Sequence, residues 1–463
     1  MSGSFQNIKD REQGLQRRLT SGQMSMIAIG GAIGTGLFLG SKFAIGFAGP
    51  SVLLSYAIGG LITLLLMGCL AEMTVAHATS GSFGAYAEHY ISPLAGFLVR
   101  YAYWSCIVLA VGTEVTAVAD YMRFWFPAVP SWWWIALFSA ALIAVNASSV
   151  KAFGAVEYAF SSIKIAAILG FILLGSYVVW GGGHPEYGVH LYTAGDGFMP
   201  HGWWGMWVAV IISIFSYLSV EMIAVAAGEA EDPERAVKQA FRATIARLLV
   251  FYLLSLALIL AIVPWSRVGQ GSSPFVTVME VLNIPYAAGI LNFVVVVAAL
   301  SAMNSQLYIT TRMMFSLSRG GDAPAALGKL SRNGVPLNAL LLSSIGIAVA
   351  TLLYVLYPEK AFMLMISLSM FGAMFVWLMI FVTHLFFRRK YQAGGNPPLA
   401  FRMRGFPFTT LLGLGLMLAA MVTTLFTDEF NMTLKFGLPF LALLVLLFRF
   451  VRRQRGALAR NAA

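Results

Sequence analysis

Long apolar segments follow one another along almost the whole chain, and they restrict its fold more than any other feature. Each has about 20 residues or more, the length that an α-helix needs to cross the hydrocarbon core of a bilayer. Of the 463 residues, 59% are hydrophobic and only 11% are charged. Because unpaired backbone groups are not tolerated in lipid, the segments are predicted to be transmembrane helices. The chain is therefore predicted to be an all-α integral membrane protein.

We predict about twelve spans, an even number that places both termini on the same side of the membrane. They cover about residues 24–47, 50–76, 97–126, 132–150, 156–180, 203–228, 243–263, 287–317, 336–357, 362–386, 408–426 and 436–450. Residues 79–86 are interpreted as a polar loop. Residues 181–202 contain no Lys or Arg and are interpreted as an external loop.

The net charge of +11 is distributed as expected for a membrane protein. Lys and Arg gather at alternate loops, those that share a side with the N-terminus, as in residues 388–390 and 449–455. This positive-inside bias predicts a multi-pass protein of the cytoplasmic membrane with both termini in the cytoplasm. The charges are too scattered over the loops to indicate a nucleic-acid partner. Cys69 and Cys106 lie in apolar segments and predict neither a disulfide nor a metal site.

Glycine is unusually dense in the first span, where five of the eleven residues 30–40 are glycine. Each costs about 1 kcal/mol relative to alanine inside a helix. We predict a break at residues 33–36, because the free N–H groups of the second half-helix would then form a site for a carboxylate. The pairs Gly30/Gly34 and Gly36/Gly40 also fit a helix-packing motif, so both interpretations stay open on this stretch alone.

A second interruption is predicted in the sixth span, five spans after the first. Residues 215–221 place two serines, a tyrosine and Glu221 at membrane depth. Acidic groups there are costly and usually functional. Interrupted spans at corresponding positions of two halves are typical of inverted-repeat transporters.

Several separated motifs resemble those of the amino acid–polyamine–organocation superfamily. They are residues 33–38 in the first span, 81–87 after the second, 215–221 with 227–234, 304–305 with 312–324, and 401–407 before the eleventh span. Within the superfamily, the chain resembles the bacterial amino acid transporter family, which includes aromatic, proline and GABA permeases. The resemblance extends over about residues 19–449.

The resemblance implies a five-plus-five inverted repeat with broken helices 1 and 6. Residues 1–20 would be a cytoplasmic tail, 21–180 the first repeat, 203–390 the second, and 391–463 spans 11 and 12 with the C-terminal tail. It also implies a secondary transporter that imports L-amino acids with protons by alternating access. Such a protein, a monomer or weak oligomer in lipid, would be no enzyme and would need no cofactor beyond the proton gradient. An exchanger of the same fold, or a membrane nutrient sensor, is the alternative.

The same resemblance implies the substrate site. Gly34, Thr35 and Gly36 would hold the substrate carboxylate, and Thr35 would add a hydroxyl. The carbonyls of Ala32, Phe215, Ser216 and Leu218 would accept the substrate ammonium, and Phe215 would also close over the ligand as a gate. The family often has glycine where this chain has Leu218 and Ser219, which leaves the fine substrate open.

Lys164 is the only Lys or Arg deep inside a predicted span. Burial disfavours the charged form of an ammonium. Family members that resemble this chain have a lysine at this position. Sodium-coupled relatives bind a sodium ion there instead. We expect Lys164 to carry the coupling proton or to replace the ion permanently, next to first-span carbonyls and Ser301 or Ser305. A fixed structural ammonium is the alternative.

The remaining candidates line or support the site. Val111, Glu114 and Phe371 are expected to form the side-chain pocket; Glu114 is alternatively a second proton carrier or a structural carboxylate. Glu72 is expected to serve an inner gate or the structure, and Glu221 to hold the unwound part of span 6. The histidines are expected outside the spans and show no ligand spacing, so no metal is predicted.

Overall fold

The computed structural model describes residues 33–77, 79, 81–221, 246, 248–269, 273–395, 399 and 401–461. Within these ranges the chain is helical and contains no strand. Nine helical stretches of this part are long and apolar enough to cross a membrane, and Gly202–Ser216 and Leu249–Ile262 are shorter apolar helices. One stretch, Gly36–Ala76, contains two predicted spans. Each of the twelve predicted spans thus has a helix, and the predicted class is confirmed.

The elements that form the spans are η1 Gly36–Gly40 with α3 Ser41–Ala48, α4 Val52–Ala76, α6 Pro93–Met122, α7 Ser131–Ser148, α8 Val150–Ser176, α9 Gly202–Ser216, η5 Leu248–Leu254 with α12 Ser255–Ile262, α15 Ala287–Arg319, α16 Leu337–Ser343 with α17 Ile345–Leu356, α18 Ala361–Ala393, α19 Phe408–Thr423 and α20 Met432–Asn461. The chain reverses between α3 and α4 at Gly49, whose φ is 60°. A Cβ there would lie 2.3 Å from Cγ of Pro200, so both conformation and space require glycine.

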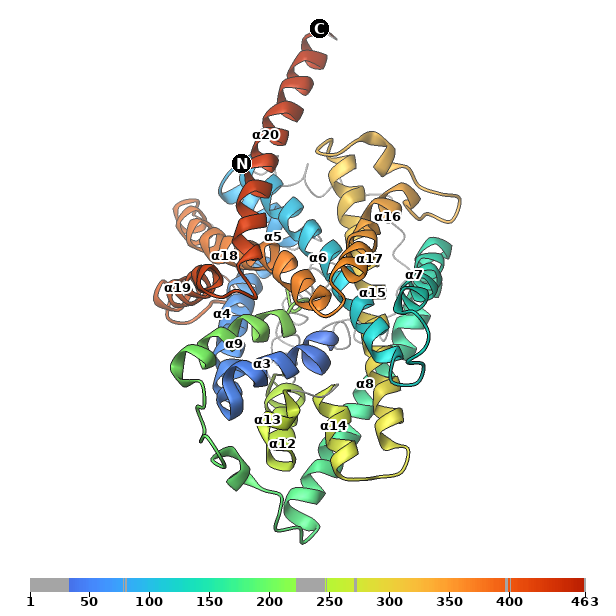
Figure 1. The fold of residues 1–463 in the computed structure, drawn as a ribbon. Helices are drawn as coiled ribbons and strands as arrows, with labels where there is room; N and C mark the ends of the chain where they lie inside the picture. The colour runs from blue at the N-terminus through green and yellow to red at the C-terminus, as the bar shows by residue number, and fades with distance from the viewer. Residues whose placement is uncertain are drawn as a thin grey trace.

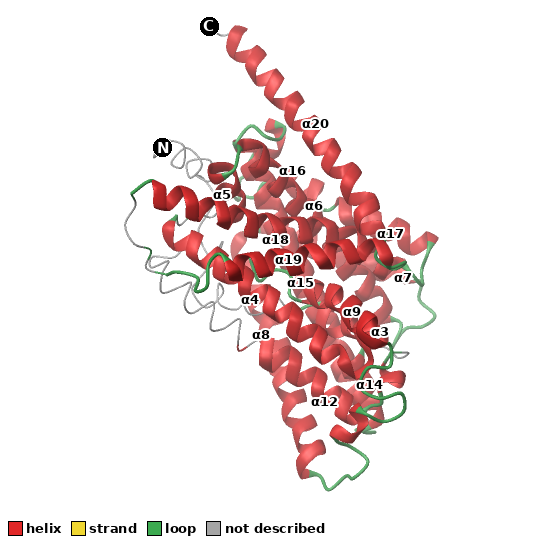
Figure 2. Ribbon diagram, turned by 90° about the vertical axis from the view of Figure 1, so that its left-hand side faces the viewer, coloured by secondary structure: helices red, strands yellow, loops and turns green. Residues whose placement is uncertain are grey.

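Three long helices, α6, α15 and α18, form the centre of the molecule (Figure 1). Both α15 and α18 pack along α6, α8 packs against α15, and α3 and α4 pack against α9. The last helix, α20, lies at the side and projects beyond the body at its C-terminal end (Figure 2). This arrangement brings α3, α6, α8, α9 and α15 together around the middle of the molecule.

Three short α-helices of the described chain were not predicted. α13, Trp265–Val268, and α14, Pro274–Val281, lie between α12 and α15, and α5, Ser82–Tyr90, replaces most of the predicted loop at residues 79–86. Phe83, Tyr86 and Tyr90 are buried on one face of α5, at the spacing of an amphipathic helix. The helix packs against α6 and α18. The loop prediction is wrong, because packing of these buried side chains against α6 and α18 outweighs the turn preference of the glycines and serines that open the segment.

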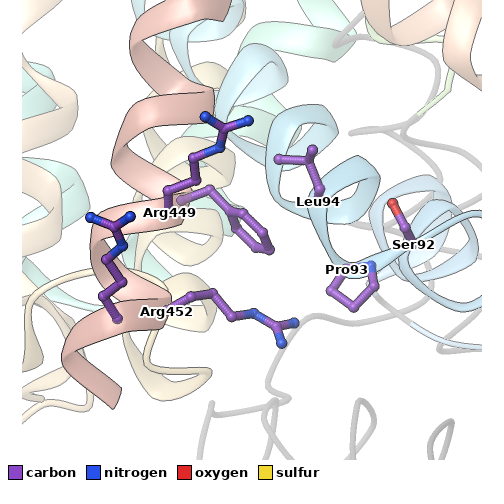
Figure 3. A pocket seen from close by; sticks show the side chains of 7 residues that line it. Ser92, Pro93, Leu94, Arg449 and Arg452 are labelled. Atoms are coloured by element: carbon purple, nitrogen blue, oxygen red, sulfur yellow. The ribbon is translucent and has the colours of Figure 1, made fainter. Parts of the chain in front are cut away.

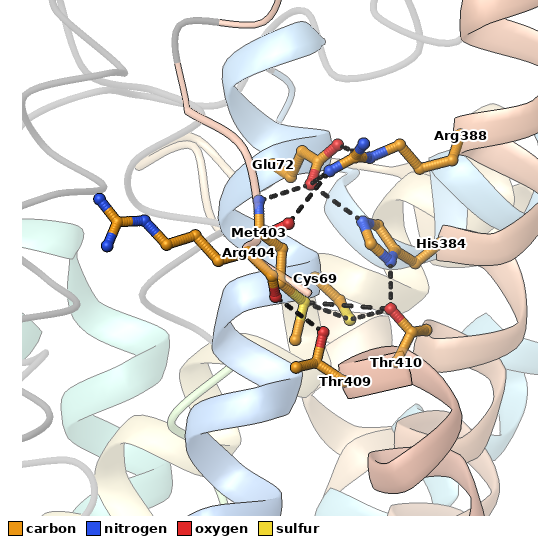
Figure 4. A network of polar contacts seen from close by, with 8 residues as sticks. All are labelled: Cys69, Glu72, His384, Arg388, Met403, Arg404, Thr409 and Thr410. Carbon is orange, nitrogen blue, oxygen red and sulfur yellow. Dashed lines mark hydrogen bonds and ion pairs between the residues drawn. The ribbon is translucent and has the colours of Figure 1, made fainter. Parts of the chain in front are cut away.

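A buried ionic network ties α4 to α18 and to the segment before α19 (Figure 4). Oε2 of Glu72 accepts hydrogen bonds from Nη2 of Arg388 and from the backbone N–H of Met403, both at 2.8 Å. Nε2 of His384 lies 3.2 Å from the same oxygen, and Nδ1 lies 3.0 Å from Oγ1 of Thr410 on α19. The expectation that the histidines lie outside the spans is therefore wrong for His384, which is fully buried in α18.

Candidate functional site

The second half of span 1 begins where the break was predicted. Ile33 is not helical, Gly34 forms a bend, and the helix runs from Thr35 onward. The N–H groups of Leu37 and Phe38 both donate to the carbonyl of Gly34, at 3.2 and 3.4 Å. The preceding residues, Ala32 included, lie outside the described part of the chain. The helix thus starts at mid-span, with its first N–H groups directed back toward the break.

Span 6 stops being helical close to this point. α9 ends at Ser216, and residues 217–221 form turns in which Ser219 has a φ of 75°. The carbonyl of Phe215 accepts the N–H of Leu218 at 3.2 Å. The carbonyl of Ser216 accepts the hydroxyl of Tyr252 at 2.8 Å, a partner that the sequence did not suggest. Of the carbonyls expected to receive the substrate ammonium, these two therefore already have donors in this conformation.

The two interrupted spans touch each other. Oγ of Ser216 donates to the carbonyl of Gly36 at 2.7 Å and lies 3.0 Å from the hydroxyl of Tyr56. A Cβ at Gly36 would lie only 2.7 Å from Cα of Ser216. Close approach of the backbones is thus a physical reason for glycine at position 36.

Glu221 holds the unwound part of span 6 from within. Its Oε1 accepts the hydroxyl of Tyr103 at 2.7 Å and the N–H of Ser219 at 3.2 Å, and its Oε2 accepts the indole N–H of Trp377 at 3.2 Å. The carboxylate is fully buried. It therefore links the turn after α9 to α6 and α18, which stabilises the local backbone against re-forming a helix.

Glu114 lies at the break in span 1. Its Oε2 accepts the N–H of Thr35 at 3.3 Å, so a carboxylate of the protein occupies one of the donors expected to hold the substrate carboxylate. A Cβ at Gly34 would lie 3.2 Å from its Oε1 and 3.0 Å from Cβ of Ala302. Val111 is fully buried one turn earlier on α6, on the same face as Glu114. The start of this half-helix thus donates one N–H to a carboxyl group of the protein itself.

Lys164 reaches the same break from α8. Its Nζ donates to the carbonyl of Ile33 at 3.1 Å and to Oγ of Ser301 at 2.8 Å, and the side chain is fully buried. Ser305 lies one turn further along α15; its Oγ is buried and has no hydrogen-bond partner among the described residues. Of the two serines expected near Lys164, Ser301 is the one that contacts it.

Phe371 packs between α18 and α20. Its ring stacks on Phe375, with centroids 5.9 Å apart, and a Cβ at Gly437 of α20 would fall against it. The ring thus contacts α18 and α20. Phe215 and Leu218, by contrast, are buried next to the interruption in span 6.

Glu157 was not predicted as a site residue; it is a fully buried carboxylate two turns before Lys164 on α8. It accepts hydrogen bonds from Ser301, Ser161 and Asn304. The available signal was its position at the edge of predicted span 5, seven residues from the buried lysine and hence on the same helix face.

A cavity of about 450 Å³ lies outside this group, between the start of α6 and α20 (Figure 3). It is lined by Ser92, Pro93, Leu94, Phe448 and the arginines 449, 452 and 453. None of the predicted site residues lines it, so it is separate from the two helix breaks.

The chain matches known permeases over nearly its full length. A family model described as amino acid permease matches residues 23–453. The amino-acid permease RocE of Bacillus subtilis is 37% identical over 96% of this chain and 97% of its own. The aromatic amino acid transport protein AroP of Escherichia coli K12 is 40% identical over 82% of this chain and 84% of its own. The uncharacterized amino acid permease YtnA of Bacillus subtilis is 37% identical over 93% and 94%.

These matches confirm the superfamily that the motifs indicated, and its members are transporters rather than enzymes. Together with the apolar helices, they identify a multi-pass membrane protein. The chain belongs to the amino acid permease family.

Proposed function

We propose that this permease imports L-amino acids across the cytoplasmic membrane by proton symport with alternating access. Its N- and C-termini lie in the cytoplasm, residues 21–180 and 203–390 form the two inverted repeats, and no cofactor is needed. The orientation is supported by the distribution of Lys and Arg among the loops.

The substrate binds where spans 1 and 6 are interrupted. Its carboxylate is received at Gly34, Thr35 and Gly36, and its ammonium by carbonyls near Ala32, Phe215, Ser216 and Leu218. The bond from Thr35 N–H to Glu114 supports the anion half of this proposal. Binding then requires Glu114 to withdraw or to become protonated, because two adjacent carboxylates repel each other. Phe215 closes over the bound amino acid.

The observation that carries proton coupling is the position of Lys164. Its side chain is fully buried, and its ammonium donates to the carbonyl of Ile33 in the broken span and to Ser301 of α15. Loss of its proton would weaken the hydrogen bond to the carbonyl of Ile33, which is part of the break, because a neutral amine is a weaker donor than an ammonium. The protonation of one side chain thus acts directly on the proposed substrate site, which favours symport over simple exchange.

Lys164→Gln should abolish the response of uptake to an imposed pH gradient, because the glutamine amide neither binds nor releases a proton at the pH of the experiment. We expect at least a tenfold loss of gradient-driven accumulation in proteoliposomes, while counterflow at equal pH persists. Unchanged dependence on the gradient in this variant would remove Lys164 from coupling. If the unsubstituted protein shows counterflow but its uptake does not respond to the pH gradient, the protein is an exchanger.

For the side chain of the substrate, we propose neutral amino acids, aromatic ones included. Val111 and Leu218 are buried and apolar beside the interruptions, and one set of relatives is named for aromatic amino acid transport. A competition panel of the twenty amino acids and GABA against labelled uptake tests this. Preferential inhibition by Lys, Arg, Asp or Glu would contradict it.

A further inference from the structure

A line of buried polar groups leads away from the break in span 1. It begins at the carbonyl of Ile33 and passes through Nζ of Lys164 to Oγ of Ser301, at 3.1 and 2.8 Å. Oγ of Ser301 in turn donates to Oε1 of Glu157 at 2.5 Å. One hydroxyl therefore accepts from the ammonium and donates to the carboxylate, which is the geometry of a proton relay.

The line continues beyond Glu157 toward the end of α7. Oε2 of Glu157 accepts Nδ2 of Asn304 at 3.1 Å, and Oδ1 of Asn304 accepts Nδ2 of Asn146 at 2.9 Å. Asn146 lies two residues before the end of α7 at Ser148, which is exposed. Glu157 itself is displaced from Lys164 by about 10 Å along α8, in the direction of this end. By the proposed orientation, this is the cytoplasmic side.

In the described part of the chain, Glu157 accepts hydrogen bonds from Ser161, Ser301 and Asn304, none of which is charged. The remaining titratable groups of α8 and of the elements packed on it (α7, α12, α15, η3 Tyr177–Gly181 and η5) are Lys151, Tyr158, Tyr177, Tyr252, Tyr308, Arg312 and Arg319. Lys151 is exposed, Tyr252 donates to Ser216, and the guanidinium of Arg312 lies over the ring of Tyr308 at 3.2 Å. The described hydrogen bonds therefore connect Glu157 to one cation, Lys164, through a single serine.

We infer that Glu157 is the group to which Lys164 passes the coupling proton on its way to the cytoplasm. An N–H bond of the Lys164 ammonium breaks as its proton moves to Oγ of Ser301, and the hydroxyl proton of Ser301 moves to Oε1 of Glu157. The ammonium becomes an amine, the carboxylate becomes a carboxylic acid, and the serine is regenerated. The step needs no further reactant, and it rests on the proposed proton symport.

The decisive comparison uses the full-length protein in proteoliposomes, with gradient-driven accumulation and counterflow measured on the same preparation. Glu157→Gln should lower accumulation at least tenfold while counterflow remains measurable, because glutamine accepts no proton but preserves the hydrogen-bonding shape. Glu157→Asp keeps the carboxylate and should restore part of the accumulation. A purely structural role for Glu157 would instead lower both activities together in Glu157→Gln.

Two serines provide a matched pair. Both donate to Oε1 of Glu157, but only Ser301 also contacts Lys164; Ser161 is 3.2 Å from the carboxylate and outside the relay. Ser301→Ala should lose gradient-driven accumulation, and Ser161→Ala should retain it. Should Glu157→Gln fail to fold, this pair decides the question, since equal accumulation in the two alanine variants would overturn the relay.

The outcomes also separate this inference from the proposed function. An unsubstituted protein that ignores the pH gradient would refute symport itself. A protein that follows the gradient, loses that response in Lys164→Gln and keeps it in Glu157→Gln would refute only the role of Glu157.

Discussion

Replacing Gly36 with alanine should abolish uptake. The new Cβ would lie 2.7 Å from Cα of Ser216 and 3.2 Å from its backbone N, and the backbone, unlike a flexible side-chain end, cannot move aside cheaply. The two interrupted spans would have to separate, at a cost of about 1–3 kcal/mol for such overpacking. The bond from Ser216 to the carbonyl of Gly36 would be lost at the same time. We expect at least a hundredfold fall in initial uptake rate, measured with labelled amino acid.

Gly46→Ala is the matched control for this experiment. Gly46 lies in the same span, in α3, but a Cβ there would meet nothing within 4 Å. Because alanine is favoured over glycine inside a helix by about 1 kcal/mol, this variant should be at least as stable as the parent and should transport normally. Equal uptake by the two alanine variants would refute a tight contact between spans 1 and 6.

Replacing Glu72 with glutamine should destabilise the protein by about 3–5 kcal/mol, since removing one partner of a buried ion pair leaves the other charge uncompensated. Glu72 is fully buried, Arg388 is 6% exposed, and their side chains form the ion pair drawn in Figure 4. The N–H of Met403 also depends on this carboxylate. The free energy of unfolding in detergent micelles measures the loss.

An exposed histidine–glutamate contact supplies the comparison. His184 and Glu186 lie 3.1 Å apart with side chains 51% and 55% exposed. Glu186→Gln should change the free energy of unfolding by less than about 0.5 kcal/mol, because exposed pairs contribute little in water. A loss of similar size in the two glutamine variants would show that burial of Glu72 is not what makes its network stabilising.

The sequence was sufficient for the spans, because they depend on a local property. Hydropathy over about 20 residues specifies a span. Clustered glycine near residue 36 and polar groups at residues 215–221 indicated the two breaks, but the glycines also fitted a packing motif, and only the resemblance to a known family implied broken helices. Even the pairing of Lys164 with span 1 and Ser301 could be predicted, although only through the resemblance to a known family.

What the sequence did not indicate depends on contacts between distant segments. From the sequence, Arg388 is predicted to belong to a basic cytoplasmic loop. In the structure it is buried and pairs with Glu72, 316 positions earlier in the chain. The hydroxyl of Tyr252 reaches the carbonyl of Ser216 from η5, and Glu157 meets Asn304 from α15. The hydrophobic periodicity of one segment does not indicate such partners, because each pair forms only when two helices pack together.

The hydrogen bond from Met403 to Glu72, and that between His384 and Thr410, have a consequence for protein engineering. A minimal ten-helix version of this permease, ending near residue 395, would lack both Met403 and Thr410. The ionic network would then lack the backbone N–H that donates to Glu72 and the hydroxyl that contacts the imidazole of His384. Both groups would be left without these partners inside the remaining helices. Spans 11 and 12 therefore cannot be removed without the loss of these contacts. A truncated version would need apolar residues in place of the polar network around Glu72.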